Sequence, residues 1–425
     1  MSCQIPASER VRVKFRESFA GIDKLYDRIT SPRIRDGSGS PITLELRGSG
    51  NYSFNAHGAP GPIEITWTVK FDRPLEPSQY PLVSGLGPES AQLYALDLIP
   101  EFTTEGNETY KLEGLKIEPP PGWSVKTIEN SAFVLGRIKE SSHTAMTGAW
   151  TFGDDYFSNL VESIARTQAT MLEVPVVENY LVSLAPFPYP LTGLRSAALA
   201  RQRTVVLMLN QGPDAARTRA QLERHVAHEM FHYYLPNAFR VRDNFDWFWE
   251  GFSRYSGLLT LIEMKSLTFD QFLELLLAEY DAYRVNPARN EVSLVTASPE
   301  KFASSANYEI VYRKGLIAAA LYDLELRWQS RGSKRLIKVI GGLYRDYALK
   351  NREIGNREVI DALKMAGDMS QQISDDIEGT KDIDLIARLE KFGIGLDRRL
   401  AQGAAKLVVN ENLSGRQKEL LNQFR

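Results

Sequence analysis

The residues His228-Glu229-Met230-Phe231-His232 spell the pattern H-E-x-x-H. On an α-helix, residues four apart lie on one face and one turn from each other, so His228 and His232 can both direct a ring nitrogen at one ion. Zinc accepts nitrogen ligands, and in catalytic sites it commonly has three protein ligands and one open position. The pattern therefore predicts a helix that holds zinc and needs a third ligand from elsewhere in the chain.

A second segment downstream offers a candidate for that ligand and reads Trp247-Phe248-Trp249-Glu250-Gly251-Phe252. A glutamate on a helix is more often solvated than ligating, but Glu250 stands among large aromatic side chains, where an unpaired carboxylate would be costly. A metal is the simplest partner for it. Glu229 lies beside the first histidine of the pair, where its carboxylate can take a proton from a metal-activated water as general base.

Histidines are scarce in this chain, with five in 425 residues, and three of them, His225, His228 and His232, fall within eight positions. The alternative is a helix whose histidines are ordinary core or surface residues, and the second segment argues against it. His225 lies one turn before His228 and fits a structural role better than a ligand's, because metal-binding helices usually supply only the pair. We expect the isolated His57 and His143 to be ordinary surface or packed residues.

The bulk composition is that of an ordinary folded protein, with 43% hydrophobic and 24% charged residues. The net charge is −2 with both signs interspersed, which predicts no nucleic-acid partner and no anionic membrane partner. Cys3 is the single cysteine. An internal disulfide framework and a thiolate-rich zinc site are therefore excluded, and the metal must rest on His and carboxylate.

Targeting signals are not evident in the sequence. No apolar run reaches the length of about 18 residues that a membrane span needs, and Met1 to Lys14 lacks the apolar core of a signal peptide. We therefore expect a cytoplasmic protein without a membrane partner, although a chain trimmed of its leader would look identical. The oligomeric state cannot be read from the sequence.

Three regions with different patterns follow one another along the chain. Residues 1–150 are rich in Gly, Pro and Ser with short alternating runs, which predicts an all-β domain. Residues 151–300 combine helical periodicity with two buried strands, expected at Tyr180 to Leu184 and Thr204 to Leu209. Residues 301–425 follow a period of 3.6 and predict a helical domain. The expected fold class is multi-domain α+β.

The two motif segments resemble the gluzincin metallopeptidases, and their surroundings look most like the glycyl aminopeptidase family. The matching motifs are H-E-x-F-H followed by an aromatic residue, E-G-F-[ST]-x-Y, and a later Y-x-K-G, found here at His228 to Tyr233, Glu250 to Tyr255 and Tyr312 to Gly315. The resemblance implies that the three regions are an N-terminal β domain, a thermolysin-like α/β catalytic domain and a C-terminal helical domain.

By this resemblance, His228, His232 and Glu250 hold one Zn²⁺ per chain, and Glu229 is the catalytic base. The implied activity is hydrolysis of a peptide or protein substrate by a metal-activated water, in the manner of an aminopeptidase. Two other classes stay open. One is a zinc-containing peptide-binding or scaffold protein without productive cleavage, and the other is an endopeptidase that does not require a free amine.

The resemblance also assigns a role to Tyr312, which would donate a hydrogen bond to the negative charge that develops on the carbonyl oxygen. A phenol across the site from zinc is suited to that task. Tyr308, one helical turn earlier, is the competing candidate. A packed tyrosine with a satisfied hydroxyl is the alternative.

Three departures from the family's pattern bear on specificity. Relatives that cut free N-termini carry a Glu in a Gly-Leu-Glu-like segment, and the corresponding segment here is Gly193-Leu194-Arg195-Ser196. Arg195 would repel a substrate ammonium group, so it either meets a carboxylate or forms an ordinary surface pair.

Seventeen residues separate His232 from Glu250, a spacing nearer the aminopeptidase N pattern. The roughly 30 residues after Gly395 are too few for the PDZ domain that often ends the family.

Overall fold

The structure is a computed structural model, and it describes residues 2–3, 10–59, 62–72, 75–104, 106, 109, 115–129, 131–210, 212, 214–398 and 405–424. The chain forms two compact units, which are described separately. The first unit comprises Met1–Asp154, Tyr180–Leu199 and Arg203–Thr218, and the second comprises Asp155–Asn179, Ala200–Gln202 and Arg219–Arg425. The three-domain division at residues 150 and 300 stays a prediction.

Two four-stranded antiparallel sheets of the first unit share one hydrophobic core. The strand order of the first sheet is β1 (Ser2–Cys3), β7 (Ile63–Val69), β3 (Ile29–Arg35), β4 (Pro41–Ile42). That of the second sheet is β10 (Glu101–Thr104), β2 (Arg10–Lys14), β6 (Asn51–Asn55), β5 (Glu45–Gly48). Val11 and Val13 alternate with exposed residues along β2 and pack with Ile63 and Ile65 of the other sheet. This alternation is typical of strands with one buried face, and the predicted N-terminal β region is confirmed.

The first unit contains two further sheets. One has the antiparallel order β11 (Ser124–Lys126), β12 (Ala132–Gly136), β9 (Ser90–Tyr94), β8 (Gly85–Leu86), and the other has the order β13 (Lys139–Glu140), β14 (Thr144–Met146), β15 (Leu181–Ala185), β17 (Thr204–Leu209), β16 (Ser196–Arg201). Strands β14, β15 and β17 pair in parallel. Every residue of β15 and β17 is buried, as expected for interior parallel strands. The short elements of this unit are η1 (Leu25–Arg28), η2 (Pro77–Gln79) and α1 (Ala95–Leu98).

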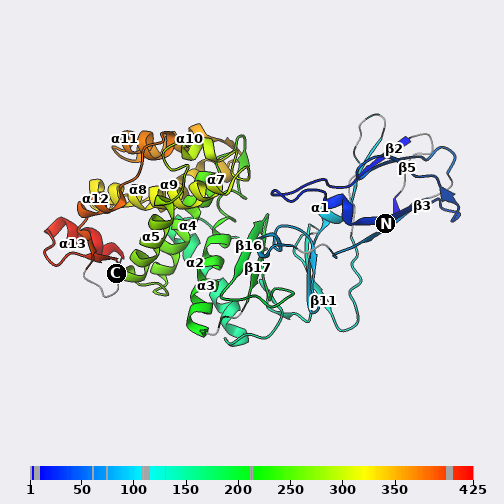
Figure 1. The fold of residues 1–425 in the computed structure, drawn as a ribbon, viewed down its shortest axis with the longest axis horizontal. Helices are drawn as coiled ribbons and strands as arrows, with labels where there is room; N and C mark the ends of the chain where they lie inside the picture. The colour runs from blue at the N-terminus through cyan, green and yellow to red at the C-terminus, as the bar shows by residue number, and fades with distance from the viewer. Residues whose placement is uncertain are drawn as a thin grey trace. The chain divides into compact units, whose positions relative to one another are not determined.

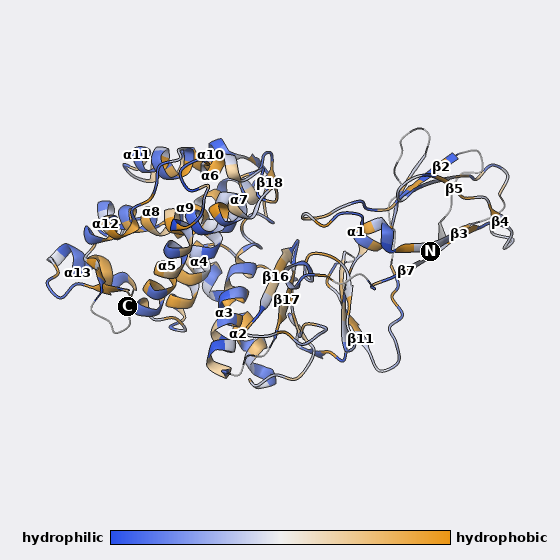
Figure 2. Ribbon diagram, viewed as in Figure 1, coloured by the Kyte–Doolittle hydropathy of each residue, from blue (hydrophilic) through white to orange (hydrophobic). Residues whose placement is uncertain are grey.

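Strand β16 is the edge of the five-stranded sheet. In Figure 2, β16 and β17 are drawn largely in the hydrophobic colour. The last residues of β16 belong to the second unit, because Ala200–Gln202 is counted there. The edge strand therefore brings a short stretch of backbone into the unit that carries the motifs.

Helices dominate the second unit (Figure 1). The longer ones are α2 (Asp154–Leu172), α3 (Ala215–Phe231), α4 (Ser253–Glu263), α5 (Phe269–Arg284), α8 (Gly315–Ser330), α9 (Leu336–Leu343) and α10 (Asn356–Ala366). Thr268 and Gln271 form a reciprocal capping box at the start of α5. The described part of the chain has no helix with the length and apolar character needed to cross a membrane.

The short elements of the second unit are α6 (Leu294–Ala297), α7 (Ser305–Glu309), α11 (Ser370–Ile373), α12 (Leu385–Glu390), α13 (Gly415–Leu421) and η8 (Asn422–Phe424). Two small sheets accompany them, one of β18 (Arg240–Val241) with β19 (Glu353–Ile354) and one of β20 (Ile394–Asp397) with β21 (Lys406–Val409). The predicted C-terminal helical region is thus confirmed and also contains a hairpin. Leu420, Leu421 and Phe424 are buried, so the last helix is docked.

The described residues include four π-helical turns, each continuous with an α-helix: η3 (Trp247–Phe252), η4 (Ile310–Lys314), η5 (Tyr344–Ala348) and η6 (Ser374–Glu378). The segment that begins at Trp247 forms η3 first and continues as α4. Likewise η4 runs directly into α8. π-Helical turns often occur at functional sites, because the extra residue per turn redirects side chains. Here η3 and η4 carry Glu250 and Tyr312.

Candidate metal centre

His228 and Glu229 lie in the last turn of α3, and His232 follows directly after the helix. Helix α3 ends at Phe231, because the following backbone N–H groups bond three residues back and tighten the chain. The two imidazole rings remain neighbours, with centroids 4.7 Å apart. The spacing of the motif therefore brings the rings together even though one of them lies beyond the helix.

The orientation of the rings directs both Nε2 atoms at Glu250. Nδ1 of His232 lies 2.9 Å from the carbonyl oxygen of Leu235. Because a carbonyl oxygen only accepts, Nδ1 is the donor and Nε2 is left for a metal. Oε2 of Glu250 lies 3.6 Å from Nε2 of His228 and 3.4 Å from Nε2 of His232.

One ligand atom from each of His228, His232 and Glu250 lies within 4.8 Å of the others. The three side chains are 9–13% exposed. Two imidazole nitrogens with one carboxylate oxygen are a donor set that suits zinc and leaves a fourth position open. The residues fit the ion that the sequence predicts.

The charges of the cluster favour an ionised carboxylate. Burial would raise the pKa of Glu250, but Lys301 and the two histidines outweigh it and hold that pKa well below its ordinary value. Burial would likewise lower the pKa of His232, but the hydrogen bond and charge of Glu250 raise it to about 9. A carboxylate that attracts a proton to a buried imidazole also attracts a divalent cation.

Glu229 is 7% exposed, and Oε1 of its carboxylate lies 3.9 Å from Nε2 of His228. Burial raises the pKa of Glu229, and the neighbouring histidines and a backbone hydrogen bond at Ala200 offset this only in part. A carboxyl group whose pKa is raised by burial is suited to exchange a proton near neutral pH. Ala200 lies in β16, so this edge strand contributes a backbone hydrogen bond to the carboxylate of Glu229.

Tyr312 and Tyr308 stack on each other, with ring centroids 4.4 Å apart and planes inclined at 29°. Burial, followed by the charge of Glu250, raises the pKa of Tyr312 well above its ordinary value. Tyr312 is thus a neutral phenol that can donate a hydrogen bond. Tyr308 is 42% exposed and covers one face of that ring.

Gly251 and Gly315 allow η3 and α8 to cross in direct backbone contact. A Cβ atom on Gly251 would lie 2.5 Å from Cα of Gly315, and one on Gly315 would lie 2.9 Å from Cα of Gly251. Each glycine is therefore needed for the close approach of the other helix. Both occur in the motifs quoted from the sequence, as E-G-F and Y-x-K-G, but that analysis did not reveal that they meet.

Two charged residues beside Glu250 were not predicted from the sequence. Lys301 is 6% exposed, and its Nζ lies 2.5 Å from Oδ2 of Asp246 and 3.0 Å from Oε1 of Glu250. One signal was available: Asp246 and Glu250 are four residues apart in an aromatic segment, so both face one side of a helix and together require a cation. Nothing in the sequence near Lys301 identifies it as that cation.

His225 does not contribute a ligand atom to the cluster. Burial, followed by the positive charge of His228 and two arginines, lowers the pKa of His225 to about 3. The ring is therefore neutral at physiological pH. The structural role expected for His225 stays a prediction.

The segment with Gly193 and Arg195 belongs to the first unit. Gly193 has φ +70°, and its carbonyl oxygen accepts a hydrogen bond of 2.6 Å from Nδ2 of Asn210. The backbone N–H of Arg195 donates to Oδ1 of the same asparagine. Asn210 therefore fixes this turn before β16, and the side chain of Arg195 is exposed. Their predicted role in substrate binding stays a prediction.

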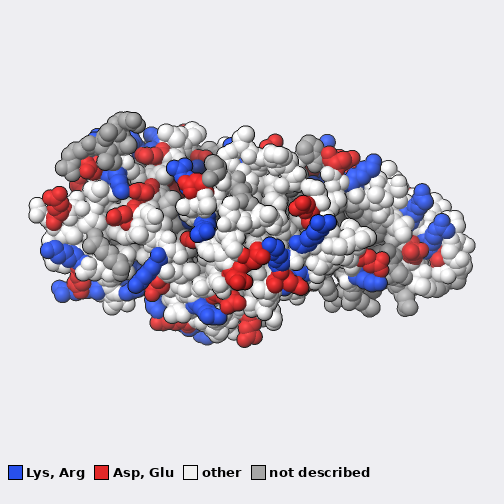
Figure 3. Space-filling view, turned by 90° about the horizontal axis from the view of Figure 1, so that it is seen from below, with Lys and Arg blue, Asp and Glu red and all other residues white. Residues whose placement is uncertain are grey.

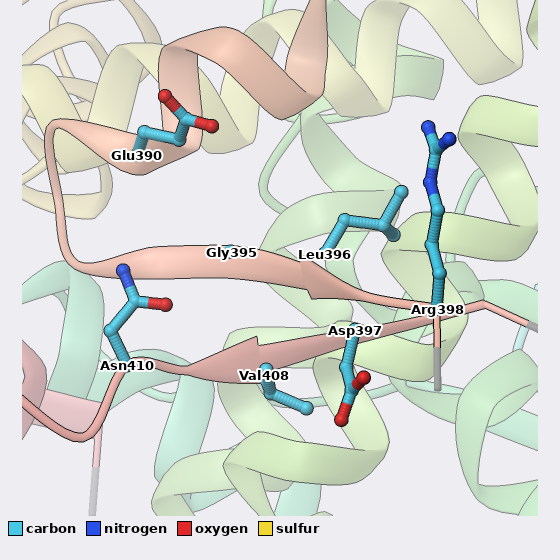
Figure 4. A pocket seen from close by; sticks show the side chains of 7 residues that line it. All are labelled: Glu390, Gly395, Leu396, Asp397, Arg398, Val408 and Asn410. Carbon is cyan, nitrogen blue, oxygen red and sulfur yellow. The ribbon is translucent and has the colours of Figure 1, made fainter. Parts of the chain in front are cut away.

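An open pocket elsewhere in the second unit is less suited to chemistry. It is lined by residues of β20, β21 and their surroundings, among them Glu390, Asp397 and Arg398. Figure 4 shows that these charged side chains diverge rather than converge on one point. On the face in Figure 3, positive and negative side chains are interspersed without a large patch of one sign. The His–His–Glu cluster is thus the strongest candidate site in the described chain.

No protein-family model and no curated protein matches the sequence. Solved structures are similar in fold. An aminopeptidase N family protein from Idiomarina loihiensis matches with a TM-score of 0.74 and 14% identity, over 98% of this chain and 78% of that chain. A two-domain M1 zinc metallopeptidase variant bound to L-arginine matches with a TM-score of 0.51 and 12% identity, over 88% of each chain. An M1 zinc metallopeptidase from Deinococcus radiodurans matches with a TM-score of 0.49 and 13% identity, over 88% of each chain.

At these identities the likeness concerns the fold alone. The chain therefore has an aminopeptidase N-like multidomain fold, and the fold class predicted from the sequence is confirmed. The finer likeness to the glycyl aminopeptidase family, and the role of each site residue, stay predictions.

Proposed function

We propose that this protein is a zinc-dependent peptidase whose metal is held by His228, His232 and Glu250. The observation that carries the proposal is that three ligand atoms, from side chains no more than 13% exposed, lie within 4.8 Å of one another. The cluster occurs in a chain whose fold is similar to that of an aminopeptidase N family protein. A His₂Glu donor set with an open position is the arrangement of hydrolytic rather than structural zinc sites.

When bound, zinc supplies a Lewis acid that polarises a carbonyl group and lowers the pKa of water. Glu229 then acts as general base: it takes a proton from the attacking water and passes it to the leaving amine. Its raised pKa makes Glu229 a stronger base towards the attacking water. The proton can still pass on, because the leaving amine is more basic than a carboxylate.

Tyr312 donates a hydrogen bond to the carbonyl oxygen as negative charge develops there. The charges of Glu250 and Glu229 both raise the pKa of Tyr312, so the phenol keeps its proton beside them. Its stacking on Tyr308 restricts the ring to one orientation. Tyr308 is assigned the supporting position because it is the more exposed of the two.

The proposal is tested by mass spectrometry of a peptide library with and without a metal chelator. Cleavage is expected from the parent chain and should stop when the chelator is added and return with zinc. Glu229→Gln should retain zinc and lose roughly 10²–10⁴-fold in turnover. A Glu229→Gln variant that cleaves as fast as the parent contradicts this mechanism. Zinc binding without any cleavage would favour the peptide-binding or scaffold class.

We further propose that the substrates are peptides and that Arg195 does not select a free amine. Its guanidinium is always charged and would repel a substrate ammonium. One peptide is compared in N-terminally free and acetylated forms. Equal cleavage supports an endopeptidase, whereas a strict demand for the free amine supports an aminopeptidase and excludes this role of Arg195. If Arg195 repels the amine, Arg195→Glu should shift the preference towards the peptide with the free amine.

A further inference from the structure

The buried ammonium of Lys301 lies in the segment between α6 and α7, which contributes no other charge to the cluster. Its side chain is 8% exposed, and those of Asp246 and Glu250 are 8% and 13% exposed. Charges in such a setting are weakly screened, so each one depends on its partners. Lys301 therefore interacts with the third candidate ligand far more strongly than a surface lysine would.

The two oxygens of Glu250 have different partners. Oε1 accepts a hydrogen bond of 3.0 Å from Nζ of Lys301. Oε2 faces Nε2 of His228 at 3.6 Å and Nε2 of His232 at 3.4 Å. A carboxylate with both oxygens free can bind a metal through one oxygen or through two. The hydrogen bond to Lys301 leaves only Oε2 directed at the histidines.

We infer that Lys301 is a positioning residue that restricts Glu250 to binding zinc through Oε2 alone. This inference rests on the proposed function, because it concerns the same metal. Lys301 has three donors and no acceptor, so it can bond Asp246 and Glu250 together but cannot ligate the ion itself while it is charged. With Glu250 held to one oxygen, one position of the ion stays open for the reacting groups.

Asp246 keeps Lys301 in place. Its Oδ2 lies 2.5 Å from Nζ, and it precedes Glu250 by four residues, so both carboxylates approach the ammonium from one side of the same segment. Nζ also lies 5.8 Å from the ring centroid of Tyr312 and 4.9 Å from that of Phe302, within the range of cation–π attraction. Lys301 therefore links the third ligand to the element that carries the candidate oxyanion donor.

The test uses a double variant of the full chain, Lys301→Met with Asp246→Asn, which removes one positive and one negative charge together. Net charge near the metal is then unchanged, so that any effect reports the lost hydrogen bond on Oε1. Zinc affinity, measured by competition with a chromophoric chelator, should fall by about 10–100-fold, the usual effect of losing an outer partner of a ligand. The cobalt-substituted variant should absorb more weakly than the cobalt-substituted parent, because a second carboxylate oxygen raises the coordination number.

Lys314→Met is the matched control, because Lys314 is also buried and its Nζ donates to the backbone carbonyl of Gly379 at 3.4 Å rather than to a carboxylate of the cluster. It should leave the cobalt spectrum and the zinc affinity unchanged. If the double variant does not fold, Lys301→Ala with Asp246→Ala takes its place with the same expectations, since it also removes one charge of each sign and water can enter the space that is left. A parent-like cobalt spectrum and zinc affinity in either variant would overturn the inference.

The failure of this inference is distinguishable from failure of the proposed function. Glu250→Ala should lose zinc whether or not Lys301 has the positioning role. If Glu250→Ala binds zinc as tightly as the parent, the proposed metal site is wrong. If Glu250→Ala loses zinc but the Lys301 variants do not, the site stands and only the positioning role of Lys301 is wrong.

Discussion

His228 and His232 come from one short segment at the end of α3, whereas Glu250 and Tyr312 lie on two π-helical turns that are far apart in sequence. The first pair needs only the local spacing of the motif. The second pair depends on the glycine crossing between η3 and α8 and on a buried lysine from a third segment. One half of the candidate site is thus built by local geometry and the other half by tertiary contacts.

This difference suggests how each half responds to substitution. A change in the local half removes a ligand and leaves the backbone intact, because helix α3 does not depend on the imidazoles for its hydrogen bonds. In the other half, a change in a residue that touches neither metal nor substrate can displace a functional group, because the backbones of two elements are in contact there. Substitutions in the two halves should therefore differ: loss of a ligand lowers metal affinity, and displacement of a backbone lowers stability.

The largest effect is expected from His228→Ala, which removes a ligand of the local half. Zinc affinity should fall by more than the roughly 10–100-fold typical of substituting a residue that hydrogen-bonds to a ligand. The circular dichroism spectrum should stay that of the parent. His57→Ala is the control, because His57 is exposed in the first unit. Metal content after gel filtration checks the result, and a His228→Ala protein that keeps its zinc contradicts the ligand assignment.

Tyr312→Phe should lower kcat by about 10²–10³-fold with little change in KM, because a donor to the developing negative charge acts in the transition state. Tyr308→Phe is the comparison: it keeps the stacked ring and removes only the hydroxyl that hydrogen-bonds Tyr312, so it should change kcat much less. Steady-state kinetics on one cleaved peptide measure both. Equal losses in the two variants would mean that the phenol of Tyr312 has no special role.

Gly251→Ala should destabilise the fold by about 1–3 kcal/mol, because the added methyl group meets the backbone of Gly315 and neither helix can yield without moving the other. Gly342→Ala in α9 is the matched control, since a Cβ atom there meets nothing within 4 Å. It should be neutral or stabilise by up to about 1 kcal/mol. Urea denaturation compares them, and similar midpoints would show that the crossing tolerates a side chain.

The smallest effect concerns the support of η3 by helix α10. Nε1 of Trp247 donates to Oδ1 of Asn356 at 2.8 Å, and Glu358 accepts hydrogen bonds from the backbone of Gly355 and from Arg242. Burial would raise the pKa of Glu358, but a hydrogen bond from its own backbone N–H, together with those from Arg242 and Gly355, outweighs burial and lowers that pKa below its ordinary value. A lowered pKa in the folded state means that ionised Glu358 stabilises the fold.

That stabilisation is fully present above the unfolded pKa of about 4.3 and is lost as the pH falls through the lower folded value. Glu358→Gln should therefore cost about 0.2–1 kcal/mol at pH 7 and nothing at the acid end of a Tm series. Glu118→Gln is the control, because its ion pair with Lys116 is exposed on both sides. A difference between Glu358→Gln and the parent that persists unchanged into acid would exclude this linkage.

Much of the architecture is readable from the sequence because it follows from periodicity. Alternation predicts the strands around Val11 and Ile63, continuous apolar runs predict β15 and β17, and the helical period predicts α5 and α8. The π-helical character of η3 and η4 was not predicted. A local pattern of apolar residues does not distinguish a 3.6-residue period from one extra residue in a single turn.

The sequence by itself determined which residue types make up the candidate metal site: H-E-x-x-H sets two imidazoles and a carboxylate by spacing along one segment, and Glu250 stands out as an acid among aromatic residues. Only the tertiary structure decided how the rest is held. The contact of Gly251 with Gly315 and the bond from Lys301 to Oε1 of Glu250 join positions about 50 or more residues apart. Such contacts depend on which backbones approach each other in the folded chain, and no local spacing encodes that.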